Sequence, residues 1–143
     1  MATLKVEIVT PEAPLWVGDA TSFTARSSEG AFTILPQHTS TVGDLISGVV
    51  RVQTSEGELA FAVHGGFFQV GPDDIEGVTL TTVLAGVAER VSDIDTARAQ
   101  RAKEAAEAAL AASARTDQLD DAATLVARAA LERAELRLAC AAR

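Results

Sequence analysis

The composition of the chain changes abruptly near residue 92, and this change limits the folds that the chain can adopt. Residues 92–143 contain nineteen alanines and neither glycine nor proline. Alanine has the highest intrinsic helix propensity, so this stretch predicts helix. The segment SARTD at 113–117 interrupts the alanine pattern, and so short a connection folds two helices back on each other. The sequence therefore predicts an antiparallel helical hairpin whose first helix covers residues 94–112.

Residues that can cap helices stand at the start of both predicted helices. Ser92 is expected to be the N-cap of the first helix, with Asp95 as the acid of a capping box. Thr116 or Asp117 is expected to cap the second. Asp95 and Arg98 are three residues apart, so they can also form a surface ion pair on one helical face.

Large apolar side chains are scarce in the predicted hairpin. The first helix has only Ile94 and Leu110, and the second has five leucines and one valine over more than one face. Apolar burial stabilises by roughly 25 cal/mol per Å², and a methyl group buries little area. We therefore expect the two helices to be held weakly and to form a detachable part of the protein.

The first 84 residues have the pattern of short β-strands. In LKVEIV at 4–9, apolar and charged residues alternate with the period of a half-buried strand. The further runs TSFTAR, AFTIL, VVRVQT, LAFAVH, FFQV and VTLTTVL are separated by the turn-forming groups PEAP, GD, SSEG, SEGE, HGG and GPDD. The predicted fold is an all-β N-terminal sandwich, a flattened barrel of about ten short strands, over residues 1–88. The helical hairpin follows over residues 89–143.

Charge and composition exclude several functions. The net charge is −8, and residues 1–91 carry eleven acidic against four basic residues. Nucleic-acid binding needs a field of lysine and arginine, which this chain lacks. No run of 18 apolar residues is present, so we expect no insertion into a membrane.

Motifs of enzyme chemistry are also missing. The sequence contains neither a G-x-S-x-G nucleophile nor a G-x-x-x-x-G-K phosphate loop, and HGGF at 64–67 is interpreted as a glycine turn. Two histidines and one cysteine are too few for a metal cluster. We expect no catalytic residue, no metal and no required cofactor.

Five segments together resemble a known family. They are VTPEAPLWVGDATSF at 9–23, SSEGAFTILPQHT at 27–39, GVVRV at 48–52, GGFFQV at 65–70 and a match to I/L-D-x-x-R-A at 94–99. In this order and spacing they resemble the epsilon subunit of bacterial F-type ATP synthase, over essentially the whole chain.

The resemblance implies a non-catalytic rotor subunit of a proton-translocating enzyme. Its expected partners are the gamma subunit of the central stalk, the ring of membrane c subunits and, through an extended hairpin that inhibits ATP hydrolysis, the catalytic alpha and beta subunits. Its expected place is the cytoplasmic face of the bacterial plasma membrane, as a peripheral protein. An adaptor that binds its partner through the hairpin, outside any ATPase, is the alternative.

The resemblance also implies a nucleotide site on the hairpin, with ATP as a regulatory ligand. The residues that match the family are Glu89, Ile94, Asp95, Arg98, Ala99, Arg133 and Arg137. Arginines bind phosphate oxygens in a fork, and an acid can accept from the base or the ribose. Family members that bind tightly carry a further arginine where this chain has Ala105. Plain helix capping by Asp95, or an ion pair with Arg98, stays open beside this hypothesis.

The segment at 27–39 implies a second site. By resemblance, the loop that carries Glu29, Pro36 and His38 faces the membrane ring. The alternative is that these residues only form turns, because Ser-Glu-Gly is ordinary turn chemistry.

Overall fold

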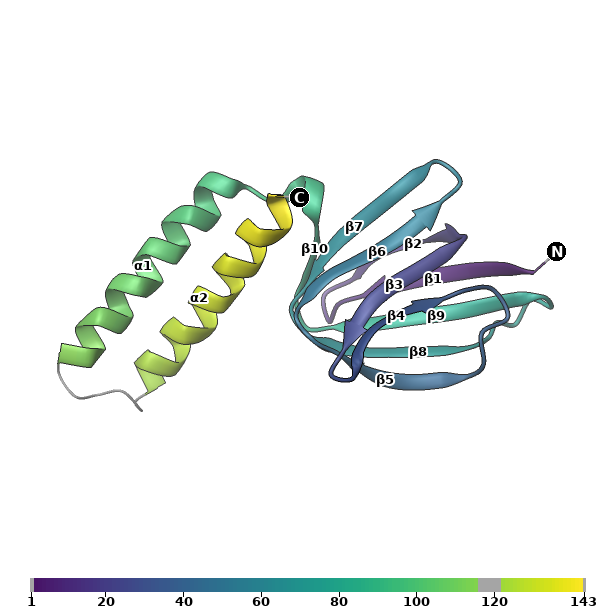
Figure 1. Cartoon of the computed structure of the whole chain (residues 1–143), viewed down its shortest axis with the longest axis horizontal. Coiled ribbons are helices and arrows are strands. Elements are labelled where there is room, and N and C mark those ends of the chain that lie inside the picture. Colours follow the sequence, from purple (N-terminus) through teal and green to yellow (C-terminus); the bar gives the residue numbers. More distant parts are fainter. Residues whose placement is uncertain (1, 116–121, 143) are drawn as a thin grey trace. The chain divides into compact units, whose positions relative to one another are not determined.

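The computed structural model describes residues 2–115 and 122–142 and divides into two compact units, Met1–Arg90 and Val91–Arg143. The first is a β-sandwich and the second a helical hairpin, which confirms the predicted fold class (Figure 1). The expected boundary after residue 88 falls within the last strand, β10 (Ala88–Arg90). Whether residues 1–88 fold alone stays a prediction.

Two five-stranded sheets form the sandwich. The first has the order β2-β1-β9-β8-β5 and the second β10-β7-β6-β3-β4. All strand pairs are antiparallel except β1 with β9, which run parallel. The strands other than β10 are β1 (Thr3–Val9), β2 (Pro14–Ala20), β3 (Ser22–Ser27), β4 (Gly30–Ile34), β5 (Thr41–Leu45), β6 (Gly48–Thr54), β7 (Gly57–Val63), β8 (Gly66–Pro72) and β9 (Val78–Ala85).

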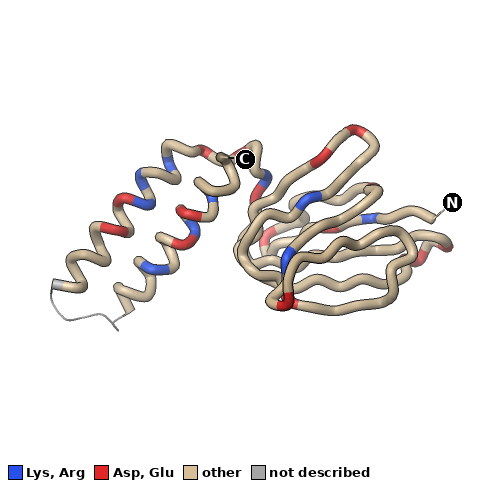
Figure 2. The backbone as a smooth tube through the Cα atoms, viewed as in Figure 1, with Lys and Arg blue, Asp and Glu red and all other residues tan. Residues whose placement is uncertain are grey.

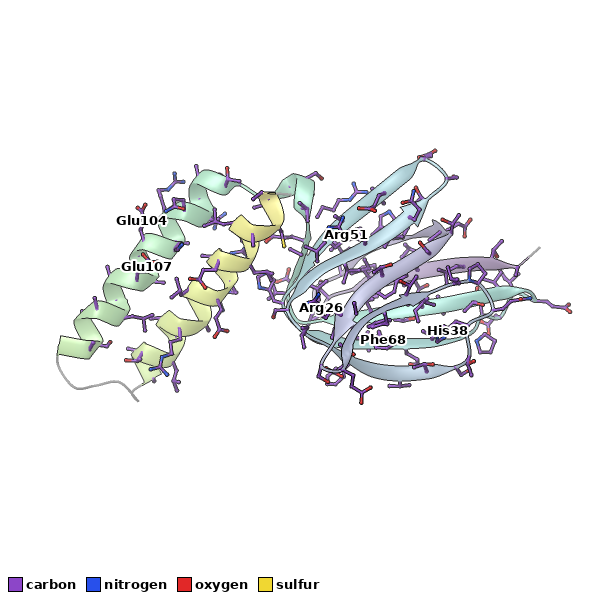
Figure 3. All side chains as sticks on the ribbon, in the orientation of Figure 1. Arg26, His38, Arg51, Phe68, Glu104 and Glu107 are labelled. Atoms are coloured by element: carbon purple, nitrogen blue, oxygen red, sulfur yellow. The ribbon has the colours of Figure 1, made fainter. Side chains whose placement is uncertain are left out.

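The core lies between the two sheets and follows from the alternation along each strand. In β1, Leu4, Val6 and Ile8 are fully buried, while Lys5 and Glu7 between them form an ion pair of 3.7 Å. Phenylalanines from both sheets add the largest side chains, and Phe68 lies among them between the sheets (Figure 3). The core residues are Leu4, Val6, Ile8, Phe23, Ala25, Ile34, Leu45, Val50, Val52, Phe61, Val63, Phe68, Val70, Val83 and Ala85.

The pair Gly18-Asp19 is not a turn, as the sequence suggested, but part of β2. The indole of Trp16 covers Gly18, and a Cβ on this glycine would lie 2.7 Å from Cζ2 of the ring. Trp16 in turn packs against Phe61 with ring centroids 6.1 Å apart. The glycine therefore serves to admit an aromatic side chain within a strand.

The hairpin consists of α1 (Thr96–Arg115) and α2 (Ala122–Ala141), preceded by a short 3-10 helix, η1 (Val91–Asp93). α1 runs through Ser113 to Arg115, so the predicted break at 113–117 begins too early, because Ser113 and Ala114 continue the helix. Thr116 and Asp117, the expected caps of the second helix, lie outside the described residues. The side chains buried in the hairpin are small: Ala99, Ala106, Thr124, Ala127, Ala134 and Cys140.

Both helices carry charges of both signs along their length (Figure 2). Two pairs on α1 are four residues apart: Gln100 donates a hydrogen bond of 3.1 Å to Glu104, and Lys103 lies 3.9 Å from Glu107. Such pairs contribute only about 0.2–0.5 kcal/mol each. They support the helix itself rather than the contact between the helices.

Candidate functional site

The start of α1 is organised by Asp95. Its Oδ1 accepts a hydrogen bond of 3.0 Å from the main-chain N–H of Arg98, which is the bond of an N-cap to the third residue of a helix. The main-chain N–H of Ala99 donates to the carbonyl of Asp95 at 3.0 Å. Asp95 is thus the N-cap, and the interaction with Arg98 uses the main chain of that residue rather than its guanidinium.

Ser92 is not the N-cap, which corrects the prediction. It lies in η1, whose last turn is closed by a hydrogen bond of 3.2 Å from Ile94 N–H to the carbonyl of Val91. Ser92 and Asp95 are both good capping residues three apart. The tight turn at 91–93 moves the start of the helix to the second of them.

The remaining residues predicted for nucleotide binding differ in accessibility. Arg98 is exposed, Ile94 is half-buried, and Ala99 is buried with 3% exposure, so Ala99 packs within the hairpin. Arg133 and Arg137 are half-buried in the C-terminal half of α2, on either side of the fully packed Ala134 in sequence.

The antiparallel course of the helices brings this half of α2 beside the start of α1, and α2 also contacts η1 (Figure 1). Two arginines and a carboxylate thus belong to the same end of the hairpin. Glu89, by contrast, belongs to the sandwich unit, where it pairs in register with Ala62 of β7.

Capping by Asp95 and contact with a ligand are chemically compatible. A carboxylate has about four lone-pair sites, and the hydrogen bond to Arg98 uses one of them. The guanidinium groups of the end of α2 can bind phosphate oxygens in pairs. In the described part of the chain no group of three or more histidine, cysteine, aspartate or glutamate side chains could hold a metal ion.

The structure separates Glu29 from Pro36 and His38, which the resemblance placed in one loop. Glu29 lies in the two-residue turn between β3 and β4, and Pro36 and His38 follow the other end of β4. Seven residues of largely extended chain span on the order of 20 Å. Figure 3 shows Arg26, which precedes the first turn, and His38 toward opposite ends of the sandwich.

The second of these turns is fixed by three hydrogen bonds. His38 N–H donates to the carbonyl of Leu35 at 3.1 Å, and the Nδ1 of His38 donates to the carbonyl of Thr39 at 2.8 Å. Gln37 has a φ of 69°, which is uncommon for this residue, and its N–H donates to Oγ1 of Thr79 at 2.8 Å. His38 therefore has a structural role in the turn.

Sequence reasoning missed an exposed apolar row on the first sheet. We use this name for Val42, Phe67 and Leu84, which are 75, 63 and 50% exposed. Phe67 pairs with Leu84 of β9 and with Asp44 of β5, and Val42 is two residues from Asp44 on the same strand. Exposed apolar side chains that adjoin in this way form a candidate contact surface. Two consecutive phenylalanines at 67–68 were the available signal, because one of them must face outward from a strand.

Comparison with known proteins finds matches in one family. Residues 3–91 match the model of the ATP synthase delta/epsilon chain β-sandwich domain. The ATP synthase epsilon chain of Anoxybacillus flavithermus is 39% identical over 100 residues, which cover 70% of both chains. That of Corynebacterium jeikeium is 41% identical over 102 residues, which cover 70% of this chain and 78% of the relative. The family model thus covers the sandwich and ends at the start of the hairpin.

Two solved structures have a similar fold. A chain of the Euglena gracilis mitochondrial ATP synthase, from its OSCP/F1/c-ring structure, aligns with a TM-score of 0.74 at 23% identity, over 100% of this chain and 83% of that one. A chain of the Tetrahymena thermophila mitochondrial ATP synthase central stalk and c-ring gives a TM-score of 0.52 at 13% identity, over 96% of both chains. No helix in the described residues is long and apolar enough to span a bilayer.

Proposed function

The chain belongs to the family of ATP synthase epsilon chains, and we propose that it is a non-catalytic rotor subunit of a proton-translocating F-type ATP synthase. In this role it joins the gamma subunit of the central stalk to the ring of membrane c subunits. The match of the sandwich to the family model is the observation that carries the proposal. It favours this role over an adaptor outside any ATPase.

The surface of the sandwich supports a role in assembly. The apolar row gives a partner a contact that excludes water, because its three side chains are at least half exposed and adjoin across strands. The acidic balance of residues 1–91 complements a basic partner, which orients docking. Contact with the ring would hold the chain at the cytoplasmic face of the bacterial membrane as a peripheral protein.

Purification of the native complex tests the assembly. A tagged copy of the chain, expressed in its own organism, should recover the gamma, c, alpha and beta subunits. Substitution of Phe67 by Asp should lower this recovery without unfolding the sandwich, since the side chain is exposed. Val17→Asp, at a residue of β2 that is 47% exposed, is the matched control. Recovery of unrelated proteins in place of these subunits would favour an adaptor.

The hairpin is proposed to regulate ATP hydrolysis by moving between positions. Elements of low local stability are the ones that move, and the helices here are joined through alanine, threonine and cysteine rather than large apolar side chains. An extended hairpin would reach the catalytic alpha and beta subunits and inhibit them. Removal of residues 91–143 should raise ATP hydrolysis by the reassembled complex while the complex still forms. Unchanged hydrolysis would leave the coupling role without the inhibitory one.

The end of the hairpin that contains Asp95, Arg133 and Arg137 is proposed to bind ATP. We expect a dissociation constant between micromolar and millimolar, or roughly 4–8 kcal/mol. Hydrogen bonds to charged groups contribute about 1.5–3 kcal/mol each, so Arg133→Ala or Arg137→Ala should weaken binding about ten- to a hundredfold in a calorimetric titration. Arg128→Ala, on an exposed position of α2, is the matched control.

Two substitutions of Asp95 separate a ligand contact from helix capping. Asparagine caps a helix as well as aspartate does, whereas alanine does not. If Asp95 contacts ATP through its charge, both variants should bind ATP more weakly. If Asp95 only caps the helix, Asp95→Asn should bind ATP as the unmodified protein does. If no heat is measured at millimolar ATP, the proposed nucleotide site is wrong.

A further inference from the structure

Two turns of the sandwich are built in the same way. Residues 27–30, between β3 and β4, read SSEG, and residues 54–57, between β6 and β7, read TSEG. In each turn the hydroxyl of the first residue accepts from the N–H of the glutamate, at 3.1 Å in the first turn and 3.2 Å in the second. The same hydroxyl lies 3.3 and 2.8 Å from the carbonyl oxygen of the glycine. The glycines have φ angles of 127° and 130°. The local bonds of the two turns are therefore equivalent.

Only the first turn is fastened to the opposite sheet. Asp44 of β5 accepts two hydrogen bonds from Ser28, one from its N–H at 2.9 Å to Oδ2 and one from its hydroxyl at 3.0 Å to Oδ1. Beside it, Ile46 N–H donates to the carbonyl of Arg26 at 3.1 Å. Within the described residues, Ser55 at the matching place of the second turn has no carboxylate acceptor. Asp44 is therefore an added constraint on one of two like turns.

The geometry of the turn explains why such a constraint has an effect. Two-residue hairpin turns favour positive φ at their tip, because this twist matches the strands. Ser28 and Glu29 do not have positive φ, and only Gly30 takes up the twist. The conformation of the tip therefore depends on Gly30 and on the hydrogen bonds that the turn forms with its neighbours. A carboxylate that accepts two hydrogen bonds restricts it strongly, since hydrogen bonds to charged groups are the stronger ones.

The chemistry of Asp44 agrees with this role. The hydrogen bonds from Ser28, first from its N–H and then from its hydroxyl, lower the pKa of the Asp44 carboxyl below its ordinary value of 3.8. The carboxylate therefore stays ionised at neutral pH and keeps both bonds. Glu29, next to Ser28, is exposed and forms no ion pair within the described part of the chain. Its charge is available to a partner.

We propose that Asp44 is a positioning residue, which holds the turn at 27–30 so that Glu29 meets a basic side chain of the membrane ring. This inference rests on the proposed rotor function. Asp44 itself does not touch the ring. It lowers the conformational freedom that Glu29 would otherwise lose on binding, and preorganisation of this kind increases affinity without a new contact.

The proposal predicts a non-additive pair of substitutions. Binding of the whole chain to the purified c-ring of the same ATP synthase, in detergent micelles, is measured by surface plasmon resonance. Loss of the two bonds in Asp44→Ala should weaken binding about three- to tenfold. In the Glu29→Ala background, Asp44→Ala should have no further effect, because no charge is left to position. Asp44→Asn keeps an acceptor oxygen and should give an intermediate loss.

The like turn supplies the matched control. Glu56→Ala changes the same residue type in the same turn geometry without a fastening carboxylate, and it should leave the affinity for the ring unchanged. Amide hydrogen exchange of the free protein gives a readout independent of the ring. Asp44→Ala should increase exchange at Ser28 and Glu29 and not at Ser55 and Glu56.

The outcomes distinguish this proposal from the function on which it rests. If Glu29→Ala leaves the affinity unchanged, the contact of Glu29 with the ring is wrong, and the role of Asp44 falls with it. If Glu29→Ala weakens binding but Asp44→Ala does not, only the positioning role is wrong. An equal loss from Asp44→Ala with and without Glu29 would mean that Asp44 contacts the ring directly, which also overturns the proposal.

Discussion

The sheets of the sandwich bury Phe23, Phe61 and Ile34, whereas the helices of the hairpin bury alanine, threonine and cysteine, and leave Leu125 and Val126 more than half exposed. Full burial of a large apolar side chain stabilises by roughly 1.5–3 kcal/mol, and burial of a methyl group by much less. The sandwich is therefore expected to set the stability of the protein, and the hairpin is expected to be free to move between positions.

The difference also separates two uses of small residues. In the sandwich, Gly18 has no side chain, and this leaves room for the indole of Trp16, which packs over it. In the hairpin, Ala99, Ala106 and Ala134 are small on both sides of the contact. The first arrangement adds apolar contact and the second reduces it. Small residues thus strengthen one unit and weaken the other.

The largest expected effect is on the isolated hairpin. A fragment of residues 91–143 should lose cooperative folding, and its helical circular dichroism should fall gradually on heating, because its two helices bury only small side chains. A fragment of residues 1–90, which keeps β10, should unfold in one cooperative transition. A disordered 1–90 fragment would contradict the assignment of stability to the sandwich.

Truncation of one core residue should come next. Phe61→Ala removes a fully buried ring and should lower the free energy of unfolding of the sandwich by about 3–5 kcal/mol in a urea titration. Phe67→Ala, on a side chain that is 63% exposed, is the matched control and should change it by less than about 1 kcal/mol. Similar losses from both substitutions would mean that the apolar row is part of the core.

Removal of the cap of α1 should affect the hairpin alone. Asp95→Ala loses the hydrogen bond to the Arg98 N–H and should destabilise the hairpin by about 1 kcal/mol, seen as faster amide exchange along α1. The transition of the sandwich should not move. Asp95→Asn should restore slow exchange. If asparagine fails to do so, the charge at the helix end matters more than the cap.

The smallest effect concerns pH. The pKa of Asp44 is lowered in the folded chain, so its contribution to stability is fully present above its ordinary value of 3.8 and is lost as the pH falls through the lower value of the folded state. The melting temperature of the sandwich should therefore fall less steeply below about pH 4 in Asp44→Asn than in the unmodified chain. Asp73→Asn, in the loop between β8 and β9, makes the same change of charge as a control. Equal slopes in both variants would indicate that the bonds from Ser28 add no stability.

The sequence predicted the parts of the fold that depend on local patterns. Alternation at Leu4, Val6 and Ile8 indicated a strand with one buried face, and the alanine content indicated two helices. Strands β2 and β5 were missed, because Gly18 and Gly43 suggest turns, whereas both glycines lie beneath aromatic rings. The N-cap was placed three residues early, because Ser92 and Asp95 are equally good caps and only the tight turn of η1 chooses between them.

The sequence by itself therefore determined the two units, the faces of the strands and the residue types at the helix ends. These depend on neighbours two to four residues apart. Only the tertiary structure decided that Phe67 faces outward and that Asp44 holds Ser28. The last contact joins residues sixteen apart from different sheets. The chain between Ser28 and Asp44 can close in many ways, and the packing of the two sheets selects the one in which these residues meet. No local sequence pattern therefore predicts this contact.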